Sequence, residues 1–135
     1  MPDDFFSQWL SGLDFEYWST GQAKIEPPEF FEKWVKGEAV LLDVRTPEEK
    51  DFVIFPFALE IPINELPMRL NEIPRDKLVV TFCSGGYRAI VAFAYLHAQG
   101  FENVRFMADG YANLFPEILP AKVRALRQRR ARVGT

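Results

Sequence analysis

The sequence predicts an α/β domain with a mainly parallel sheet of about five strands flanked by helices. Short, continuously apolar segments alternate along the chain with amphipathic ones, as strands joined by crossover helices do. Two apolar segments, residues 39–44 and 77–82, show no alternation of polar and apolar residues. That pattern is typical of parallel strands buried on both faces.

Local sequence signals define the individual elements. Capping residues or prolines precede the apolar helical stretches, and glycines follow several of them. The predicted helices cover residues 5–13, 27–37, 46–52 and 88–100, with a short helix or a pair of turns over 64–73 and a helical region over 118–135. The predicted strands cover residues 39–44, 58–62, 77–82 and 103–107.

Three helices carry more specific expectations. The helix at 5–13, with Asp3 or Asp4 as its N-cap, is expected to pack on the domain or on a second copy of the chain. In the helix at 46–52, Thr46 is the N-cap and Glu49 stands where it completes a capping box. The helix at 88–100 is almost entirely apolar, so we expect it to be covered on most sides.

Composition limits the classes of function. The chain has 135 residues, 48% of them hydrophobic, which suits a single domain with its own core. One cysteine excludes an internal disulfide and a CxxC redox or zinc pair. Acidic residues stand where a secretory signal has basic ones, and no apolar run reaches membrane-spanning length. We therefore expect a cytoplasmic protein that binds no membrane.

Charge divides the chain unevenly. The formal net charge is −3, which argues against nucleic acid as a partner. The last segment carries six Lys and Arg and no acid; we interpret it as a solvated helix end, with contact to an anionic partner as the alternative. The domains predicted are an aromatic extension over 1–24, a central domain over 25–117 and a basic tail over 118–135.

The segment CSGGYR, residues 83–88, holds the single cysteine. Cys83 ends a buried strand, at the edge of a parallel sheet where ligands bind. Gly85 and Gly86 let the backbone curl so that N–H groups converge, and the start of the next helix adds partial positive charge. Arg88 adds a cation. These features favour a reactive thiolate at Cys83 over a merely buried thiol.

The pairing of LLDVRTPEE (residues 41–49) with CSGGYR resembles the rhodanese-like, or sulfurtransferase, domain, over roughly residues 25–115. The resemblance implies that Cys83 takes a sulfane sulfur from a donor such as thiosulfate or a persulfide, holds it as a persulfide, and passes it to cyanide or a thiol acceptor. It implies no metal and no organic cofactor. The loop that would bind substrate comprises Ser84, Gly85, Gly86, Tyr87 and Arg88.

Loop length separates two chemistries. Four residues lie between Cys83 and Arg88, whereas the phosphatases related to this family have one more and so a wider ring. The shorter loop favours sulfur transfer over phosphate or arsenate chemistry. Since the chain has no second cysteine, the acceptor must be external, and a sulfur-carrier protein is one candidate. We expect a monomer or a homodimer.

Several positions depart from the family pattern. Ser84 stands where a basic residue often follows the cysteine, Ala89 where a serine is common, and Ile54 and Phe57 replace a histidine and a glycine. Asp109 replaces the first of two glycines near the end of the domain. These changes, with the added N-terminal helix and the basic tail, favour one alternative, a catalytically weak binding or regulatory module. An activity like that of a phosphatase or arsenate reductase stands third.

Other residues near the predicted site allow two roles. Asp43 and Arg45 either contact substrate or form an ion pair that supports the loop, and we expect the ion pair. Tyr87, Phe55 and Phe57 either line the rim or, for the phenylalanines, belong to the core, which we expect. His97 is too far along its helix to couple with Cys83, so we expect it at the surface or at a cap.

Overall fold

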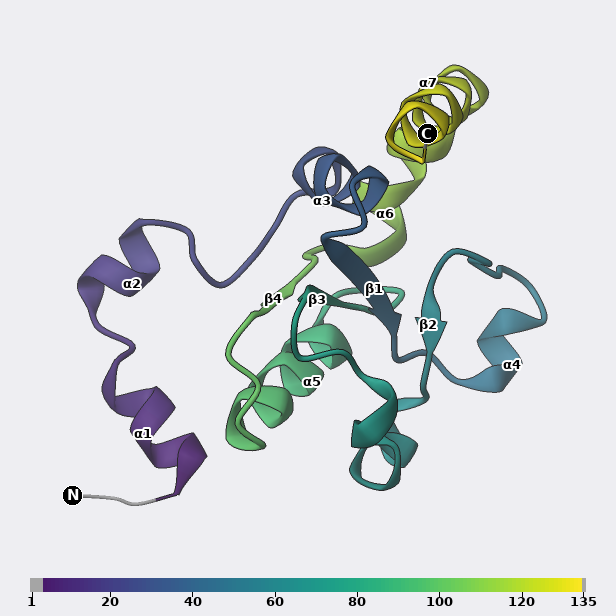
Figure 1. The fold of residues 1–135 in the computed structure, drawn as a ribbon. Helices are drawn as coiled ribbons and strands as arrows, with labels where there is room; N and C mark the ends of the chain where they lie inside the picture. The colour runs from purple at the N-terminus through teal and green to yellow at the C-terminus, as the bar shows by residue number, and fades with distance from the viewer. Residues whose placement is uncertain (1–3, 135) are drawn as a thin grey trace.

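One parallel sheet organises the fold. The computed structural model describes residues 4–134. The sheet has the order β2-β1-β3-β4, and all neighbouring strands are parallel (Figure 1). The strands are β1 Ala39–Asp43, β2 Leu59–Glu60, β3 Leu78–Phe82 and β4 Val104–Phe106. Four strands are thus described rather than about five, and a single bridge between Lys24 and Phe106 extends the β4 edge.

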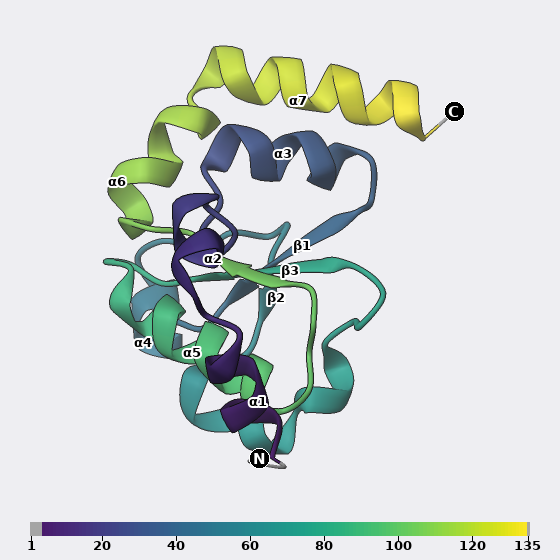
Figure 2. The ribbon, with the colours of Figure 1, turned by 90° about the vertical axis from the view of Figure 1, so that its left-hand side faces the viewer.

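Helices cover both faces of the sheet. The α-helices are α1 Phe5–Ser11, α2 Phe15–Ser19, α3 Pro27–Val35, α4 Pro47–Lys50, α5 Tyr87–Ala98, α6 Gly110–Leu114 and α7 Pro120–Val133. Three 3₁₀ segments are η1 Ile63–Met68, η2 Leu70–Glu72 and η3 Phe115–Ile118. Figure 2 shows α3 and α7 on one side of the sheet and α5 and α1 on the other. The predicted α/β architecture is confirmed.

The central strand separates two apolar cores. All five residues of β3 are buried, as expected of a strand covered on both faces. Because successive side chains point to opposite faces, Val80 and Phe82 enter the cluster beneath α3, and Val79 enters the cluster beneath α5. Apolar packing on both faces therefore fixes the position of β3 and of the loop that follows it.

The N-terminal helices pack on the domain. The Asp4 side chain caps α1 by accepting the Ser7 N–H; Asp3 lies outside the described residues. Trp9 stacks on the ring of His97 at 4.5 Å and meets Phe93 edge to face. Of the two expectations for this helix, packing on the domain is the one that the structure shows. The helix α2 was not predicted, although Asp14 caps it in the same way.

His97 corrects one expectation. It is half-buried between the Trp9 and Phe93 rings rather than fully at the surface, and Gln99 is the C-cap of α5. Its Nε2 is 3.3 Å from the Val104 carbonyl oxygen, and burial lowers the pKa of His97. The sequence did not reveal this position because the stacking partner comes from a helix far away along the chain.

The apolar helix α5 is covered on one side only. Its buried residues, Ala89, Ala92, Phe93 and Leu96, share one helical face. Ile90 and Val91 are exposed, so the expectation of coverage on most sides is wrong. The sheet and α1 together leave the opposite face of α5 to solvent.

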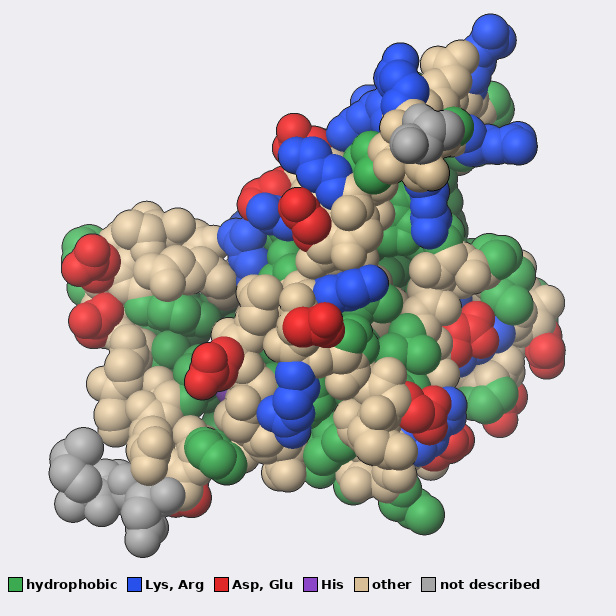
Figure 3. Space-filling model, viewed as in Figure 1, with side chains coloured by type: hydrophobic (Ala, Val, Ile, Leu, Met, Phe, Trp, Pro, Cys, Tyr) green, Lys and Arg blue, Asp and Glu red, His purple; other side chains and the backbone are tan. Residues whose placement is uncertain are grey.

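The basic residues of α7 face solvent. The helix lies alongside α3 (Figure 2), where the Arg130 guanidinium stacks on Trp34 at 3.9 Å. Figure 3 shows Lys and Arg side chains gathered over this end of the molecule. Among residues 4–134, no helix is long and apolar enough to cross a membrane.

Candidate active site at the end of strand β3

The CSGGYR segment forms a tight connection from strand to helix. Cys83 directly follows β3, and α5 begins at Tyr87. Gly86 has φ +112°, and a Cβ built there would lie 3.0 Å from the Asp109 backbone nitrogen. Glycine is therefore required at this position, because a side chain would meet both backbone strain and a close neighbour.

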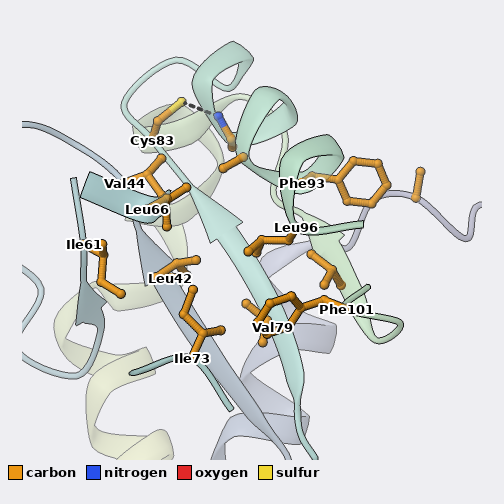
Figure 4. Close-up of a cluster of buried hydrophobic side chains, with 14 residues drawn as sticks. Leu42, Val44, Ile61, Leu66, Ile73, Val79, Cys83, Phe93, Leu96 and Phe101 are labelled. Carbon is orange, nitrogen blue, oxygen red and sulfur yellow. Dashed lines mark hydrogen bonds between the residues drawn. The ribbon is translucent and has the colours of Figure 1, made fainter. Parts of the chain in front are cut away.

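Two backbone N–H groups point at the sulfur. Gly86 donates to Cys83 Sγ at 3.0 Å, and Ala89 donates at 3.3 Å. Figure 4 shows the sulfur at the carboxyl end of the strand, turned towards the start of α5. Together with the partial positive charge of the helix start, these donors form an arrangement that suits an anionic group.

The Cys83 side chain is fully buried among apolar residues. Cys83 is 0% exposed and belongs to the same apolar cluster as Val44 and Leu66 (Figure 4). The side chain thus combines the two roles that the sequence analysis treated as alternatives, a buried apolar residue and a thiol presented to a loop. Its carbon atoms pack in the core, and its sulfur is bound by the amides of the loop.

Arg88 closes the loop through a carboxylate. Its Nη1 and Nη2 donate to the two oxygens of Glu49 at 2.7 and 2.9 Å, and Nη2 also donates to Ser84 Oγ at 2.9 Å. These contacts raise the pKa of Arg88. The hydrogen bonds from Arg88, with those from Thr46, lower the pKa of Glu49 from 4.5 to about 2. Both groups therefore stay charged at neutral pH.

Glu49 was predicted only as part of a capping box. The box is present: the Thr46 side chain accepts the Glu49 N–H, and the Glu49 carboxylate accepts the Thr46 N–H at 3.0 Å. The same carboxylate binds Arg88, which lies 39 residues away in the chain. The sequence contains no local signal for that second contact.

Asp43 and Arg45 form a fully buried ion pair. Arg45 Nη2 lies 2.7 Å from Asp43 Oδ2, and both side chains are 0% exposed. Arg45 Nη1 also donates to the Val53 carbonyl oxygen at 2.9 Å and to the Tyr111 hydroxyl at 2.7 Å. A buried pair needs such additional bonds to offset its desolvation. Arg45 thereby joins β1, the segment after α4, and α6.

The first turn of α6 packs against the cysteine loop. The Tyr111 N–H donates to the Ser84 carbonyl oxygen at 3.0 Å. A Cβ at Gly110, which has φ +48°, would collide with that same oxygen. Asp109 has φ +62°, a conformation that Asp tolerates better than most residues. The change from the usual glycine at this position is thus compatible with the local backbone.

Of the two phenylalanines, Phe55 lies in the core as expected, whereas Phe57 is only half-buried. Phe55 is buried and lies 4.7 Å from the Arg45 guanidinium. Phe57 is half-buried among Phe31 and Trp34. Tyr87 is exposed beside the loop. Among the described residues, no group of His, Cys, Asp and Glu side chains is placed to hold a metal.

The family model for the rhodanese-like domain matches residues 27–115. The chain belongs to the rhodanese-like family. A sulfurtransferase of Allochromatium vinosum is 40% identical over 73 residues, which cover 54% of this chain and 68% of that protein. A tRNA uridine(34) hydroxylase of Xanthomonas campestris is 32% identical over 111 residues, which cover 73% of this chain and 44% of that protein.

Solved rhodanese structures show the same fold. A rhodanese-related protein from Thermoplasma volcanium has a TM-score of 0.62 at 28% identity, covering 73% of this chain and 95% of its own. A human single-domain sulfurtransferase has a TM-score of 0.61 at 28% identity, covering 73% and 99%. The similarity thus extends over nearly the whole of two single-domain rhodanese structures, and over less than half of the tRNA hydroxylase.

Proposed function

We propose that this protein is a sulfurtransferase that carries a sulfane sulfur on Cys83 as a persulfide. The observation that carries the proposal is the sulfur itself, held by two N–H donors at the carboxyl end of β3. Membership of the rhodanese-like family supports the same chemistry, and the similarity to a curated sulfurtransferase agrees with it.

The reaction divides into two displacements. The Cys83 thiolate attacks the outer sulfur of the donor, a new S–S bond forms, and the donor's own S–S bond breaks. The leaving group, which is sulfite when thiosulfate is the donor, departs with the electron pair. An acceptor such as cyanide then attacks the outer sulfur and leaves as thiocyanate, and the electron pair of the S–S bond returns to Cys83 Sγ, which restores the thiolate. The loop amides stabilise the anionic sulfur in both steps.

Residue roles follow from the contacts. Ser84 to Arg88 form the loop around the sulfur, with Gly86 supplying an N–H donor and Arg88 bracing the loop through Glu49. Asp43 and Arg45 support the site through the hydrogen bonds of Arg45 to the segment after α4 and to α6. Because Cys83 is the only cysteine, the sulfur must leave to an external acceptor, for which we propose a small thiol or a sulfur-carrier protein.

Intact-protein mass spectrometry tests the proposal. Incubation with a sulfane donor is expected to add the mass of one sulfur atom to the wild type, and cyanide is expected to remove it. Cys83→Ser is the matched variant and should gain no mass. A wild-type protein that stays unmodified across several donors would instead favour a binding module, and hydrolysis of an aryl phosphate would favour the phosphatase alternative.

A further inference from the structure

The cations around the candidate site are all neutralised by carboxylates. The segments that follow the carboxyl ends of the strands are 44–58, 61–72, 83–88 and 107–119. Within these described segments, every Lys and Arg forms an ion pair. The pairs are Arg45 with Asp43, Lys50 with Glu60, Arg69 with Glu65 and Glu72, and Arg88 with Glu49.

The same segments carry acids in excess. Glu48, Asp51 and Asp109 are exposed and form no ion pair with any described residue. Glu48 lies within α4 and Asp51 follows it, Glu49 of the same helix binds Arg88, and the backbone of Asp109 lies beside Gly86. The edge of the sheet that holds Cys83 is therefore negatively charged at neutral pH.

Exposed apolar side chains accompany this charge. Tyr87 at the start of α5 is 75% exposed, and Phe52 and Ile54, which follow α4, are 90% and 57% exposed. The Glu49–Arg88 pair joins α4, which precedes Phe52 and Ile54, to α5, which begins at Tyr87. An apolar and acidic surface repels small dianions and accepts apolar or cationic groups.

We propose that the sulfur donor is an organic hydropersulfide, R–S–SH, with an apolar or cationic group R, and that Glu49 sets this preference by neutralising Arg88. The inference rests on the sulfurtransferase function proposed above. Thiosulfate is a dianion, and sites that bind such anions use guanidinium groups free to donate. Both terminal nitrogens of Arg88 are already engaged by Glu49. A hydropersulfide needs no such cation.

The proposed step balances without an added oxidant. The Cys83 thiolate attacks the outer sulfur of R–S–SH, and the S–S bond of the donor breaks. R–S⁻ leaves with the electron pair and takes a proton from water, while the outer sulfur keeps its own hydrogen on the new Cys83 persulfide. The slender sulfur end of the donor also suits a thiol that is 0% exposed.

Wild-type donor preference is the first test. The rate of Cys83 persulfidation is measured with the hydropersulfides of cysteamine, mercaptoethanol and mercaptopropionate, which are cationic, neutral and anionic at R, and with thiosulfate. The expected order is cationic or neutral first, anionic next and thiosulfate last. Added salt should speed thiosulfate, a dianion, more than the hydropersulfide that is neutral at R, because salt screens repulsion. Thiosulfate reacting faster than the neutral hydropersulfide would overturn the inference.

Glu49→Gln is the second test. Glutamine retains the capping box but removes the charge that neutralises Arg88. The ratio of the thiosulfate rate to the hydropersulfide rate is expected to rise about 10-fold, equivalent to about 1.4 kcal/mol. The control Glu29→Gln removes one charge from the Arg105 ion pair and should change neither rate.

The outcomes separate the two proposals. An unchanged ratio of the thiosulfate and hydropersulfide rates in Glu49→Gln would contradict the role of Glu49. Persulfidation by no donor at all would reject the sulfurtransferase function itself. If Glu49→Gln does not fold, the salt dependence of the wild type decides the question, since it needs no variant.

Discussion

At the scale of single residues, Glu49 connects two features of the site with one carboxylate. It completes the capping box of α4 and accepts two hydrogen bonds from Arg88. Arg88 in turn donates to the Ser84 hydroxyl oxygen within the cysteine loop. The carboxylate therefore stabilises the position of α4 and the closure of the loop together.

The depressed pKa of Glu49 predicts a specific dependence of stability on pH. The folded value is about 2 against an ordinary 4.5, so the unfolded state binds the proton more readily. The stabilisation is fully present above pH 4.5 and is lost as pH falls to about 2. The free energy of unfolding of the wild type should exceed that of Glu49→Gln by about 1 kcal/mol at pH 7.

Urea unfolding of both proteins from pH 7 to pH 2 measures this difference. It should stay constant down to about pH 5 and shrink below that, because protonated Glu49 and the glutamine that replaces it are both neutral. A difference that persists unchanged at pH 2 would show that the ion pair with Arg88 is not its source.

At the scale of elements, the connection from β3 to α5 places the sulfur. The strand is buried on both faces, and the helix is held by one buried face. The connecting residues therefore have little freedom, and two glycines absorb the change in chain direction. Of these, only Gly86 has a positive φ and a close neighbour.

The two loop glycines offer a matched pair of substitutions. Gly86→Ala should lower the free energy of unfolding by about 1–3 kcal/mol, since its φ is unfavourable for alanine and its Cβ would lie 3.0 Å from the Asp109 nitrogen. The substitution should also slow persulfidation, because it displaces a donor to Cys83 Sγ. Gly85→Ala meets no atom within 4 Å and should stay within about 0.5 kcal/mol of the wild type. Denaturant titrations that give equal losses would contradict this account.

At the scale of the whole molecule, the buried Asp43–Arg45 pair joins parts that are distant in the chain. Arg45 contacts Asp43 on β1, the Val53 carbonyl after α4 and the Tyr111 hydroxyl on α6. The loop of Cys83 rests against the same α6 through the Tyr111 N–H. The ion pair thus holds together the elements that surround the sulfur.

Removing one partner tests that role. Arg45→Ala leaves Asp43 charged and buried, which should cost about 3–5 kcal/mol of unfolding free energy. Lys24→Ala breaks the exposed pair with Glu26, whose side chains are 56% and 53% exposed, and should cost at most about 1 kcal/mol. Thermal and urea unfolding measure both. Similar losses would show that burial does not determine the strength of these pairs.

Much of the fold could be predicted because its signals are local. The helix at 27–37 corresponds to α3 Pro27–Val35, and the strand at 77–82 to β3 Leu78–Phe82, since prolines, glycines and continuous apolar runs act within a few residues. The short helix α2 was missed, although Asp14 caps it. Its five residues are too few to show a clear helical periodicity of apolar residues.

The sequence by itself determined the α/β alternation, the place of Cys83 at the end of a buried strand and the short loop that follows. These features depend on the types of residues and on their spacing within short segments of the sequence. Only the tertiary structure decided that Glu49 neutralises Arg88, that His97 stacks on Trp9 and that α5 leaves one face exposed. Such contacts join residues tens of positions apart, and their partners are chosen by how the helices pack on the sheet.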